Sequence, residues 1–431
     1  MLRKGFEQFR GKRILLLQGP VGPFFARLAQ DLRTVDAEVY KINFNAGDWI
    51  FYPNQAINYR GTMQDWPAWL EELLIELNID IVQLFGDCRP IHRAAYQVAS
   101  KLNIEIQVFE EGYVRPDYVT LELNGVNGFS RLSLDPEAFS TATEVAVQTP
   151  KKLEVPNAYW SMVAFSMVYF LIGSLGKFWF RHYQHHRPLS ILEALPWIRS
   201  AWRKLWYRWS ERGQHEELTL SWHRKYYLVP LQVFNDSQLT EHSDCESIDL
   251  FIESTLISFA QHAPGDTLLV FKHHPMDRGY KDYTGLLQRL SQTAGISHRV
   301  RYIHDQHLPS LLDHARGVVI VNSTVGLSAL HHQAPTKVCG RALYNLPGLT
   351  YQGTLDEFWN QAQDFKPNRD LYQRFRMRLI NRTQLNGSFY KPLKKVHSQT
   401  GLVWSGISFG KVKKTYKPKK QKGLAESSIN P

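Results

Sequence analysis

The sequence has very few cysteines and lacks the spacings that mark disulfide frameworks and metal sites. Only three of its 431 residues are cysteine, and Cys88, Cys245 and Cys339 lie far apart. An odd number without a CxxC pair argues against disulfides, so we expect a reducing compartment in which the cysteines are small core residues. The 17 histidines include no HExxH motif and no zinc-binding Cys/His spacing. We therefore expect no metal site.

Nucleotide-binding motifs and a leader segment are also missing. The chain contains neither GxGxxG nor the P-loop sequence, and its first glycine-rich loop, QGPVGP at 18–23, resembles such a loop only loosely. No DxD motif stands at an expected strand end, which favours a donor whose leaving group is a nucleoside monophosphate over a metal-held sugar diphosphate. The apolar run at 14–17 is too short for a secretory signal, so we expect a cytoplasmic protein.

The net charge of +11 is concentrated in two parts of the chain. Residues 411–431 contain seven lysines and one acid, and residues 177–225 contain ten lysines or arginines and four glutamates. Basic patches attract polyanions or an anionic membrane, although a lysine-rich terminus can also be a disordered, solubilising tail. Because the basic stretches flank an apolar segment and do not line a sheet, we do not expect a nucleic-acid partner.

Apolar runs alternate with helical segments in two halves of the chain. Such βαβ repeats predict an α/β fold with two doubly wound parallel sheets, in which ligands bind beyond the carboxyl ends of the strands. We expect strands at 13–18, 38–44, 79–85, 104–109, 226–234, 267–271, 299–303, 317–321 and 336–339, and helices from 24 onward and at 66–77, 90–102, 247–261, 283–294 and 325–333.

An apolar and aromatic insert separates the two halves. Residues 158–176 carry no charge, and as a helix they measure about 28 Å, long enough to cross a bilayer. One crossing would separate the two halves, so we favour a monotopic or hairpin insert over a single span and over a soluble helical subdomain. Tryptophans and basic residues then alternate, as in a helix lying in a headgroup layer: Trp197, Arg199, Trp202, Arg203, Lys204, Trp206, Arg208 and Trp209.

These observations predict four segments. Residues 1–150 form a Rossmann-like acceptor domain, and 151–222 form the membrane-associating helical insert. Residues 223–400 form a second Rossmann-like domain that binds the nucleotide sugar, and 401–431 are a disordered basic tail.

The strand expected at 267–271 ends in basic residues. Lys272, His273 and His274 follow it directly, and Pro275 forces the chain off the sheet. At the carboxyl end of a parallel strand, lysine and histidine can neutralise a phosphate, and histidine can also act as an acid. On this motif alone, a loop that merely contains two histidines is an equal alternative.

Hydroxyl groups follow another strand of the same expected sheet. Asn322, Ser323 and Thr324 come after the run at 317–321, and Gly326 lies at the start of the next helix. Hydroxyls and backbone N–H groups there can bind an anion, although serine and threonine are also ordinary N-cap residues. Because the basic motif lies two strands away, we favour a phosphate-binding pair.

Adjacent carboxylates end the last strand of the first half. Glu110 and Glu111 follow the run at 104–109 and precede a glycine turn and Arg115. A carboxylate there can act as base, nucleophile or sugar anchor, and on an alternating strand end only one of the two points into the cleft. A solvated acidic turn is the alternative. Further residues expected along the same cleft are Asp87, Gly19 and Gly22.

Together these motifs resemble a known family. FEEGYVRP, FKHHP and VNSTVG, in this order across roughly residues 12–390, with QGPVGPFF and LFGDCRPIHR, are similar to the capsule polysaccharide biosynthesis family and more narrowly to its KpsS/LipB-type group. The resemblance implies a GT-B glycosyltransferase with two domains facing a cleft. It further implies transfer of Kdo, with net retention, from CMP-Kdo to lyso-phosphatidylglycerol, which starts the poly-Kdo linker of a capsular polysaccharide.

The resemblance also implies roles for matching residues. His274 and Pro275 match an HP motif that meets the CMP phosphate, and Ser323 and Thr324 match a hydroxyl motif that holds it. Departure of CMP develops negative charge, which these groups and Lys272 can stabilise without a metal or other cofactor.

The same resemblance leaves the acting carboxylate open. Glu110, Glu111 and Gly112 match an acidic-glycine motif, in which many relatives have aspartate at the second position. We expect Glu111 to act, with Glu110 as the alternative. The lipid acceptor implies a peripheral position on the inner face of the cytoplasmic membrane, beside other capsule assembly and export proteins. Two other functions stay open: a sialyltransferase-like CMP-sugar transferase, and a non-catalytic membrane adaptor for polysaccharide export.

Overall fold

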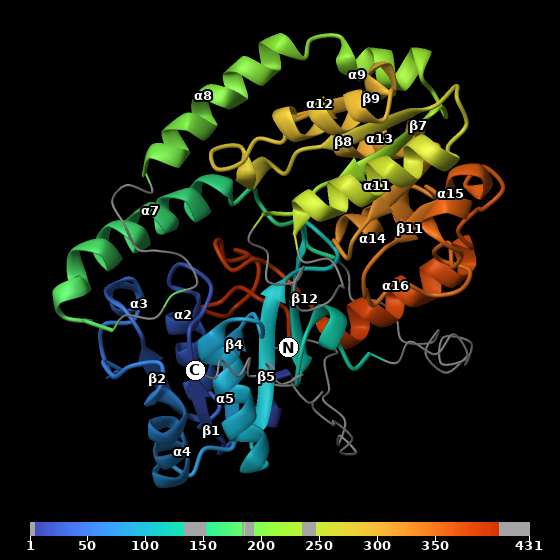
Figure 1. Cartoon of the computed structure of the whole chain (residues 1–431). Helices are drawn as coiled ribbons and strands as arrows, with labels where there is room; N and C mark the ends of the chain where they lie inside the picture. The colour runs from blue at the N-terminus through green and yellow to red at the C-terminus, as the bar shows by residue number, and fades with distance from the viewer. Residues whose placement is uncertain (1–4, 133–151, 183–184, 186–193, 235–246, 405–431) are drawn as a thin grey trace, which may run out of the picture.

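The computed structural model describes residues 5–132, 152–182, 185, 194–234 and 247–404, which form two α/β lobes (Figure 1). In the first lobe a seven-stranded sheet has the order β12-β6-β5-β4-β1-β2-β3. All neighbouring strands pair in parallel except β6, which is antiparallel to β5 and to β12. The strands are β1 (Arg13–Leu16), β2 (Glu38–Asn43), β3 (Ile57–Asn58), β4 (Ile81–Phe85), β5 (Glu105–Glu111), β6 (Tyr118–Leu123) and β12 (Gln384–Asn386).

Helices cover both faces of the first sheet because its central strands are apolar on both sides. In β1, Ile14 and Leu16 belong to a core on the side of helix α2, whereas Leu15 and Leu17 belong to a core on the other side. This continuous hydrophobicity is what a doubly covered parallel sheet requires. The helices of this lobe are α2 (Phe24–Arg33), α3 (Ala46–Phe51), α4 (Trp66–Glu76) and α5 (Pro90–Lys101).

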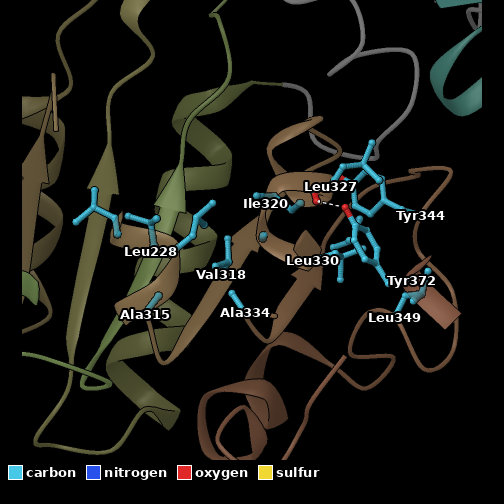
Figure 2. Close-up of a cluster of buried hydrophobic side chains, with 14 of the residues drawn as sticks. Leu228, Ala315, Val318, Ile320, Leu327, Leu330, Ala334, Tyr344, Leu349 and Tyr372 are labelled. Atoms are coloured by element: carbon cyan, nitrogen blue, oxygen red, sulfur yellow. Dashed lines mark hydrogen bonds between the residues drawn. The ribbon is translucent and has the colours of Figure 1, made fainter. Parts of the chain in front are cut away.

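The second lobe contains a five-stranded, entirely parallel sheet in the order β11-β10-β7-β8-β9. Its strands are β7 (Tyr226–Pro230), β8 (Leu268–Lys272), β9 (Val300–Ile303), β10 (Gly317–Ile320) and β11 (Thr336–Val338). Its helices are α11 (Ile248–His262), α12 (Thr284–Thr293), α13 (Leu308–His314), α14 (Val325–His331), α15 (Leu355–Gln361) and α16 (Arg369–Thr383). Figure 2 shows one of its cores, in which the Tyr372 hydroxyl donates to the Leu327 carbonyl at 3.2 Å.

The end of the chain returns to the first lobe, which corrects the predicted boundary at residue 400. After α16, strand β12 pairs with β6, and Phe389, Leu402 and Trp404 are buried in the first-lobe core. The second lobe therefore ends near residue 383, and residues 401–404 are packed and do not belong to a tail. Leu385, Phe389 and Leu402 supply the apolar surface that makes this return favourable. The basic residues from 405 onward lie outside the described residues.

The loop that follows β5 joins the two lobes. Tyr113 and Leu132, which come from the first half of the sequence, are buried in the core of the second lobe. The Tyr113 backbone N–H also donates to the Gln384 side-chain oxygen at 3.0 Å, at the point where the chain re-enters the first lobe. In Figure 1 the arrowhead of β5 accordingly points towards the second lobe. The acidic end of β5 thus lies at the junction of the lobes.

The insert forms two helices, one on each lobe. Helix α7 (Tyr159–Leu175) packs on α3 of the first lobe, and α8 (Ala194–Ser210) extends along the second lobe (Figure 1). Within α7 only Tyr169 and Gly173 are buried. Gly47 allows the close approach, because a Cβ there would lie 2.9 Å from the Tyr169 ring. Large apolar side chains elsewhere on α7 are exposed, including Trp160, Met167, Leu171 and Leu175.

These contacts bear on the alternatives for the insert, and its association with a membrane stays a prediction. Within the described residues, Tyr159–Phe178 is long and apolar enough to cross a bilayer. It does not resemble the buried core helix of a soluble subdomain, because only Tyr169 and Gly173 of α7 are buried. It also does not separate the lobes, since these share a core, and aromatic contacts from Phe165 to Phe51 and from Trp179 to Trp49 keep both of its halves on the first lobe.

Candidate functional site

Two of the predicted basic residues at the end of β8 support the turn from inside. Lys272 is buried and its Nζ donates to the His304 carbonyl at 2.8 Å. His273 is buried with its Nδ1 2.6 Å from the Tyr302 hydroxyl, and burial lowers the pKa of His273 to about 3. Each side chain already has a protein partner, so positioning of the turn is the role that the geometry favours. Direct contact with a phosphate stays a prediction for both.

His274 has a different environment from its neighbour. Its Nδ1 accepts a hydrogen bond from the Met276 backbone N–H at 3.2 Å, which caps the turn Pro275–Asp277. In the neutral ring the proton is therefore on Nε2. Burial, followed by the charges of Lys272, Arg115 and Arg278, lowers the pKa of His274 to about 4. A neutral histidine that offers an N–H among three cations is suited to binding an anion.

Arg278 is a cation of this site that the sequence did not point to. Its side chain is buried and forms an ion pair with Asp305. Its backbone carbonyl accepts from Arg203 of α8 at 2.9 Å, and the neighbouring Gly279 carbonyl accepts from Arg199 at 2.6 Å. The arginine side of α8 therefore braces the loop that carries His274.

The hydroxyl motif lies at the end of β10, two strands from β8 as predicted. The Ser323 hydroxyl accepts from the Val325 backbone N–H at 3.2 Å, and the Ser323 carbonyl accepts from the Tyr344 hydroxyl. Gly326 packs against the Tyr344 ring, where any Cβ would collide. Thr324 is the N-cap residue of α14 but its side chain makes no capping bond, which leaves its hydroxyl available to a ligand. The Asn322 backbone N–H contacts the side-chain oxygen of buried Gln232 at 3.4 Å.

The two glutamates at the end of β5 lie on opposite faces of the sheet. Glu110 shares the face of Ile106 and Val108, near Gly86 and Arg89. Glu111 lies on the other face, where its carboxylate accepts from the Tyr390 hydroxyl at 3.0 Å. The alternation confirms that the pair is split between two environments.

Burial, aided by the neighbouring carboxylates of Glu111 and Asp87, raises the pKa of Glu110 to about 7. Arg89 and the Glu111 backbone N–H, which donates to Glu110 at 2.9 Å, oppose this rise. A carboxyl group that titrates near neutral pH can both accept and return a proton. Glu110 therefore has the properties of a general acid–base group.

A polar network extends from Glu110 to the insert. The Arg89 guanidinium donates to the Gln18 side-chain oxygen at 2.8 Å, and the Gln18 amide donates to Asp48 at 3.2 Å. The Tyr169 hydroxyl of α7 donates to the same Asp48 carboxylate at 3.0 Å and accepts from Asn45 at 2.8 Å. Tyr169 was not predicted, because no sequence pattern links a residue of the apolar insert to the end of β1.

The remaining predicted residues of the first lobe hold loops in place. The Asp87 carboxylate accepts from the Val126 backbone N–H at 2.9 Å. Gly19 packs on the Phe25 ring, and Gly22, with a φ of 111°, packs on Phe165 of α7. The glycine loop thus contacts the insert helix, and its place along the acceptor side of the cleft stays a prediction.

Arg115 connects the two halves of the site. Its positive charge lowers the pKa of His274 in the second lobe and also acts on Tyr390, the partner of Glu111. The guanidinium therefore lies within electrostatic range of both groups. The structure in this way brings the acidic end of β5 and the basic turn after β8 to the same junction. Within the described residues no cluster of three or more His, Cys, Asp or Glu could hold a metal ion.

Comparisons with known proteins show the family of this chain. Residues 80–390 match the family model described as capsule polysaccharide biosynthesis protein. The chain is 41% identical over 382 residues to the capsule polysaccharide export protein KpsS of Escherichia coli, covering 88% of this chain and 97% of that protein. It is also 41% identical over 388 residues to the capsule polysaccharide modification protein LipB of Neisseria meningitidis, covering 88% and 92%.

Among solved structures, KpsC of Thermosulfurimonas dismutans, a beta Kdo 2,7 transferase, is 16% identical with a TM-score of 0.38, over 81% of this chain and 89% of that one. The family model spans well over half of the chain, and the two sequence relatives are matched along nearly their full length. The chain therefore belongs to the capsule polysaccharide biosynthesis family.

Proposed function

We propose that this protein is a glycosyltransferase of capsule assembly that transfers Kdo from CMP-Kdo to a lyso-phosphatidylglycerol lipid. The observation that carries the proposal is the lobe junction itself: Tyr113, just after the acidic end of β5, is buried in the second-lobe core, and the charge of Arg115 acts both on His274 and on Tyr390, the partner of Glu111. The relatives' names, which refer to capsule polysaccharide export and modification, support the same setting.

The second lobe would bind the leaving group. In the reaction the bond between the sugar and the CMP phosphate breaks, and negative charge develops on that phosphate. The Nε2–H of His274 and the Thr324 hydroxyl would donate to it, and the charges of Arg278 and Arg115 would stabilise it. Because these groups are held before the donor arrives, they need little rearrangement during the reaction.

The first lobe would handle the acceptor. The acceptor hydroxyl gives up its proton as its oxygen bonds to the sugar, and Glu110 is placed to take that proton because its pKa is about 7. Glu111, the carboxylate that the sequence favours, is held by Tyr390 and stays a candidate for the acting group; net retention would assign it a covalent sugar intermediate.

The insert supports a lipid acceptor. Both helices expose large apolar side chains; Trp160 of α7 is 78% exposed and Trp202 of α8 is 64% exposed. Such residues suit the interface of a membrane, where tryptophan and basic side chains gather. The enzyme would then work on the inner face of the cytoplasmic membrane, with its acceptor drawn from the same leaflet.

One assay tests the whole proposal. Purified protein is incubated with CMP-Kdo and lyso-phosphatidylglycerol, with and without a chelator, and the lipid is analysed by mass spectrometry. We expect lipid mass to increase by whole Kdo residues in both conditions. Product with CMP-sialic acid alone would favour the sialyltransferase-like alternative. Absence of turnover, together with full capsule export by a Glu110→Gln, His274→Ala double variant in cells, would favour the adaptor.

A further inference from the structure

A cavity of about 370 Å³ lies outside the lobe junction, between the end of α8 and the loop after β9. Its lining residues are Lys204, Tyr207, Arg208, Glu211, Arg212, Gly213, His215, Glu216, Asp305 and Gln306. This volume falls within the range of small-ligand sites. The ring of Tyr207 closes one wall by stacking on His304 at 3.5 Å between ring centres.

Three cations of this cavity have no ion-pair partner among the described residues. Among the described residues, Lys204, Arg208 and Arg212 have no carboxylate partner, and successive members stand four residues apart. Of the three carboxylates in the lining, Asp305 forms an ion pair with Arg278, and Glu211 accepts hydrogen bonds from the His304 backbone N–H at 3.1 Å and from the Gln306 amide at 3.0 Å, whereas Glu216 adds a further negative charge. Three unpaired cations around a concave site are suited to a phosphate ester.

Exposed apolar side chains alternate with the cavity-lining residues along α8. Leu205, Trp206 and Trp209 on the same helix are exposed, and Trp202 continues the stripe one turn earlier. Arg199 and Arg203 of the same helix instead donate to backbone carbonyls of the second lobe. A tryptophan-rich stripe directed away from the protein, beside unpaired cations, matches the two layers of a membrane surface, with headgroups next to acyl chains.

We infer that this cavity binds the headgroup phosphate of an anionic phospholipid, with the stripe of α8 lying on the leaflet. The inference goes beyond the proposed function, because the site lies outside the lobe junction and does not require a sugar donor. Bound lipid would hold α8, whose Arg199 and Arg203 brace the carbonyls of Gly279 and Arg278 beside His274. Membrane attachment would thereby stabilise the turn that meets the leaving group.

The experiment compares binding of the full chain to vesicles of phosphatidylcholine with and without phosphatidylglycerol. The variant Lys204→Gln, Arg208→Gln removes two cavity charges. Since a basic residue near an anionic surface contributes about 1 kcal/mol, we expect binding to phosphatidylglycerol vesicles to fall by roughly 10- to 30-fold. The control, Arg289→Gln, Lys366→Gln, removes equal charge from exposed positions elsewhere in the second lobe and should bind like the parent. Equal loss in both variants would overturn the inference.

Soluble competitors separate a built site from a merely charged surface. Glycerol 3-phosphate should release the protein from vesicles more effectively than sodium chloride at equal ionic strength, and the double variant should lose this difference. Equal competition by the two salts would show only non-specific electrostatic attraction to the vesicles and would overturn the inference. If CMP competes at a lower concentration than glycerol 3-phosphate, the cavity binds the sugar donor, and this outcome also overturns the inference. Failure here leaves the transferase assay unaffected, so the two proposals are tested separately.

Discussion

Burial has opposite consequences in the two lobes. In the first lobe it raises the pKa of Glu110 to about 7, so this acid retains its proton up to neutral pH. In the second lobe it lowers the pKa of His274 to about 4, so this base stays unprotonated. Loss of water favours the neutral form of both groups. One side of the site can therefore exchange a proton at physiological pH, whereas the other binds charge without changing its own protonation.

The neighbours of each group extend this contrast. Glu122, another buried carboxyl of the first lobe, also has its pKa raised to about 7 by burial, and His273 in the second lobe has its pKa lowered to about 3. Yet the charges of Lys272 and Arg278 act on His274 in the second lobe, whereas Arg89 is the cation that acts on Glu110 in the first. The lobes thus differ in the charge that they can accept: a proton in one and an anion in the other.

Substitution of the two contrasting groups should have the largest effect. Glu110→Gln keeps the size of the side chain but removes proton exchange, and His274→Ala removes the Nε2–H donor. We expect each to lower kcat for Kdo transfer by ~10²–10⁴-fold, the usual range for loss of a general acid–base group or a transition-state donor. CMP release measures the rate.

His332→Ala is the matched histidine control, since His332 lies on the far end of α14 and pairs with Asp313. It should leave kcat unchanged. A fully active Glu110→Gln enzyme together with an inactive Glu111→Gln enzyme would show that Glu111, and not Glu110, is the acting carboxylate.

The free energy of unfolding should depend on pH through Glu110 of the first lobe. Because the folded pKa of Glu110 lies above its unfolded value, its ionisation destabilises the fold progressively as the pH rises from about 4.5 to about 7. Glu110→Gln should therefore raise the free energy of unfolding at pH 8 by on the order of 3 kcal/mol, and by much less at pH 4.5. Denaturant titrations at the two pH values measure this, and an equal gain at both would contradict it.

The pH dependence of the transfer rate should reflect only Glu110 of the first lobe. Below pH 7 protonation of Glu110 removes the base, so kcat/KM should fall towards tenfold per pH unit and level off above about pH 7. His274 should contribute nothing above pH 5, since it is already neutral there. A pH profile of kcat/KM tests this, and a second break near pH 6 that disappears in His274→Ala would show that His274 is protonated in the free enzyme.

The smallest effect should come from the network that links the insert to the first lobe. Tyr169→Phe removes the hydroxyl that Asp48 and Asn45 share, at a cost of roughly 1–2 kcal/mol in unfolding free energy and a few-fold in kcat. The exposed Tyr159→Phe is its control and should change neither quantity. A loss of kcat without a loss of stability would indicate that α7 acts mainly on the orientation of Arg89 and Glu110.

The sequence predicted the parts of the fold that depend on local patterns. Apolar runs between turns are typical of buried parallel strands, and they predict strands at 79–85, 267–271 and 317–321. The structure confirms these three as β4, β8 and β10. Strand β12 was missed because its three residues, QLN, have no recognisable pattern and are held only by pairing with β6.

Long-range contacts explain what the sequence could not give at the site. Tyr390 reaches Glu111 across 279 positions, and Tyr169 reaches Gln18 across 151. Neither contact has a local signal, since each depends on how separate elements pack. The outward direction of the α8 stripe was also not predictable, because composition alone does not say whether the arginine side or the tryptophan side of a helix faces the protein.

The return of the chain to the first sheet sets the order in which the molecule can be made. Strand β6 ends at Leu123, but its partner β12 begins at Gln384, about 260 residues later. At ~5–20 residues per second the ribosome needs on the order of 10–50 s to synthesise that stretch. Throughout this interval the nascent first lobe has an unpaired edge and lacks the aromatic side chains of Phe389 and Trp404 that complete its interior. The lobe that is synthesised first is thus finished last, which makes protection by chaperones during translation most important for its amino-terminal half.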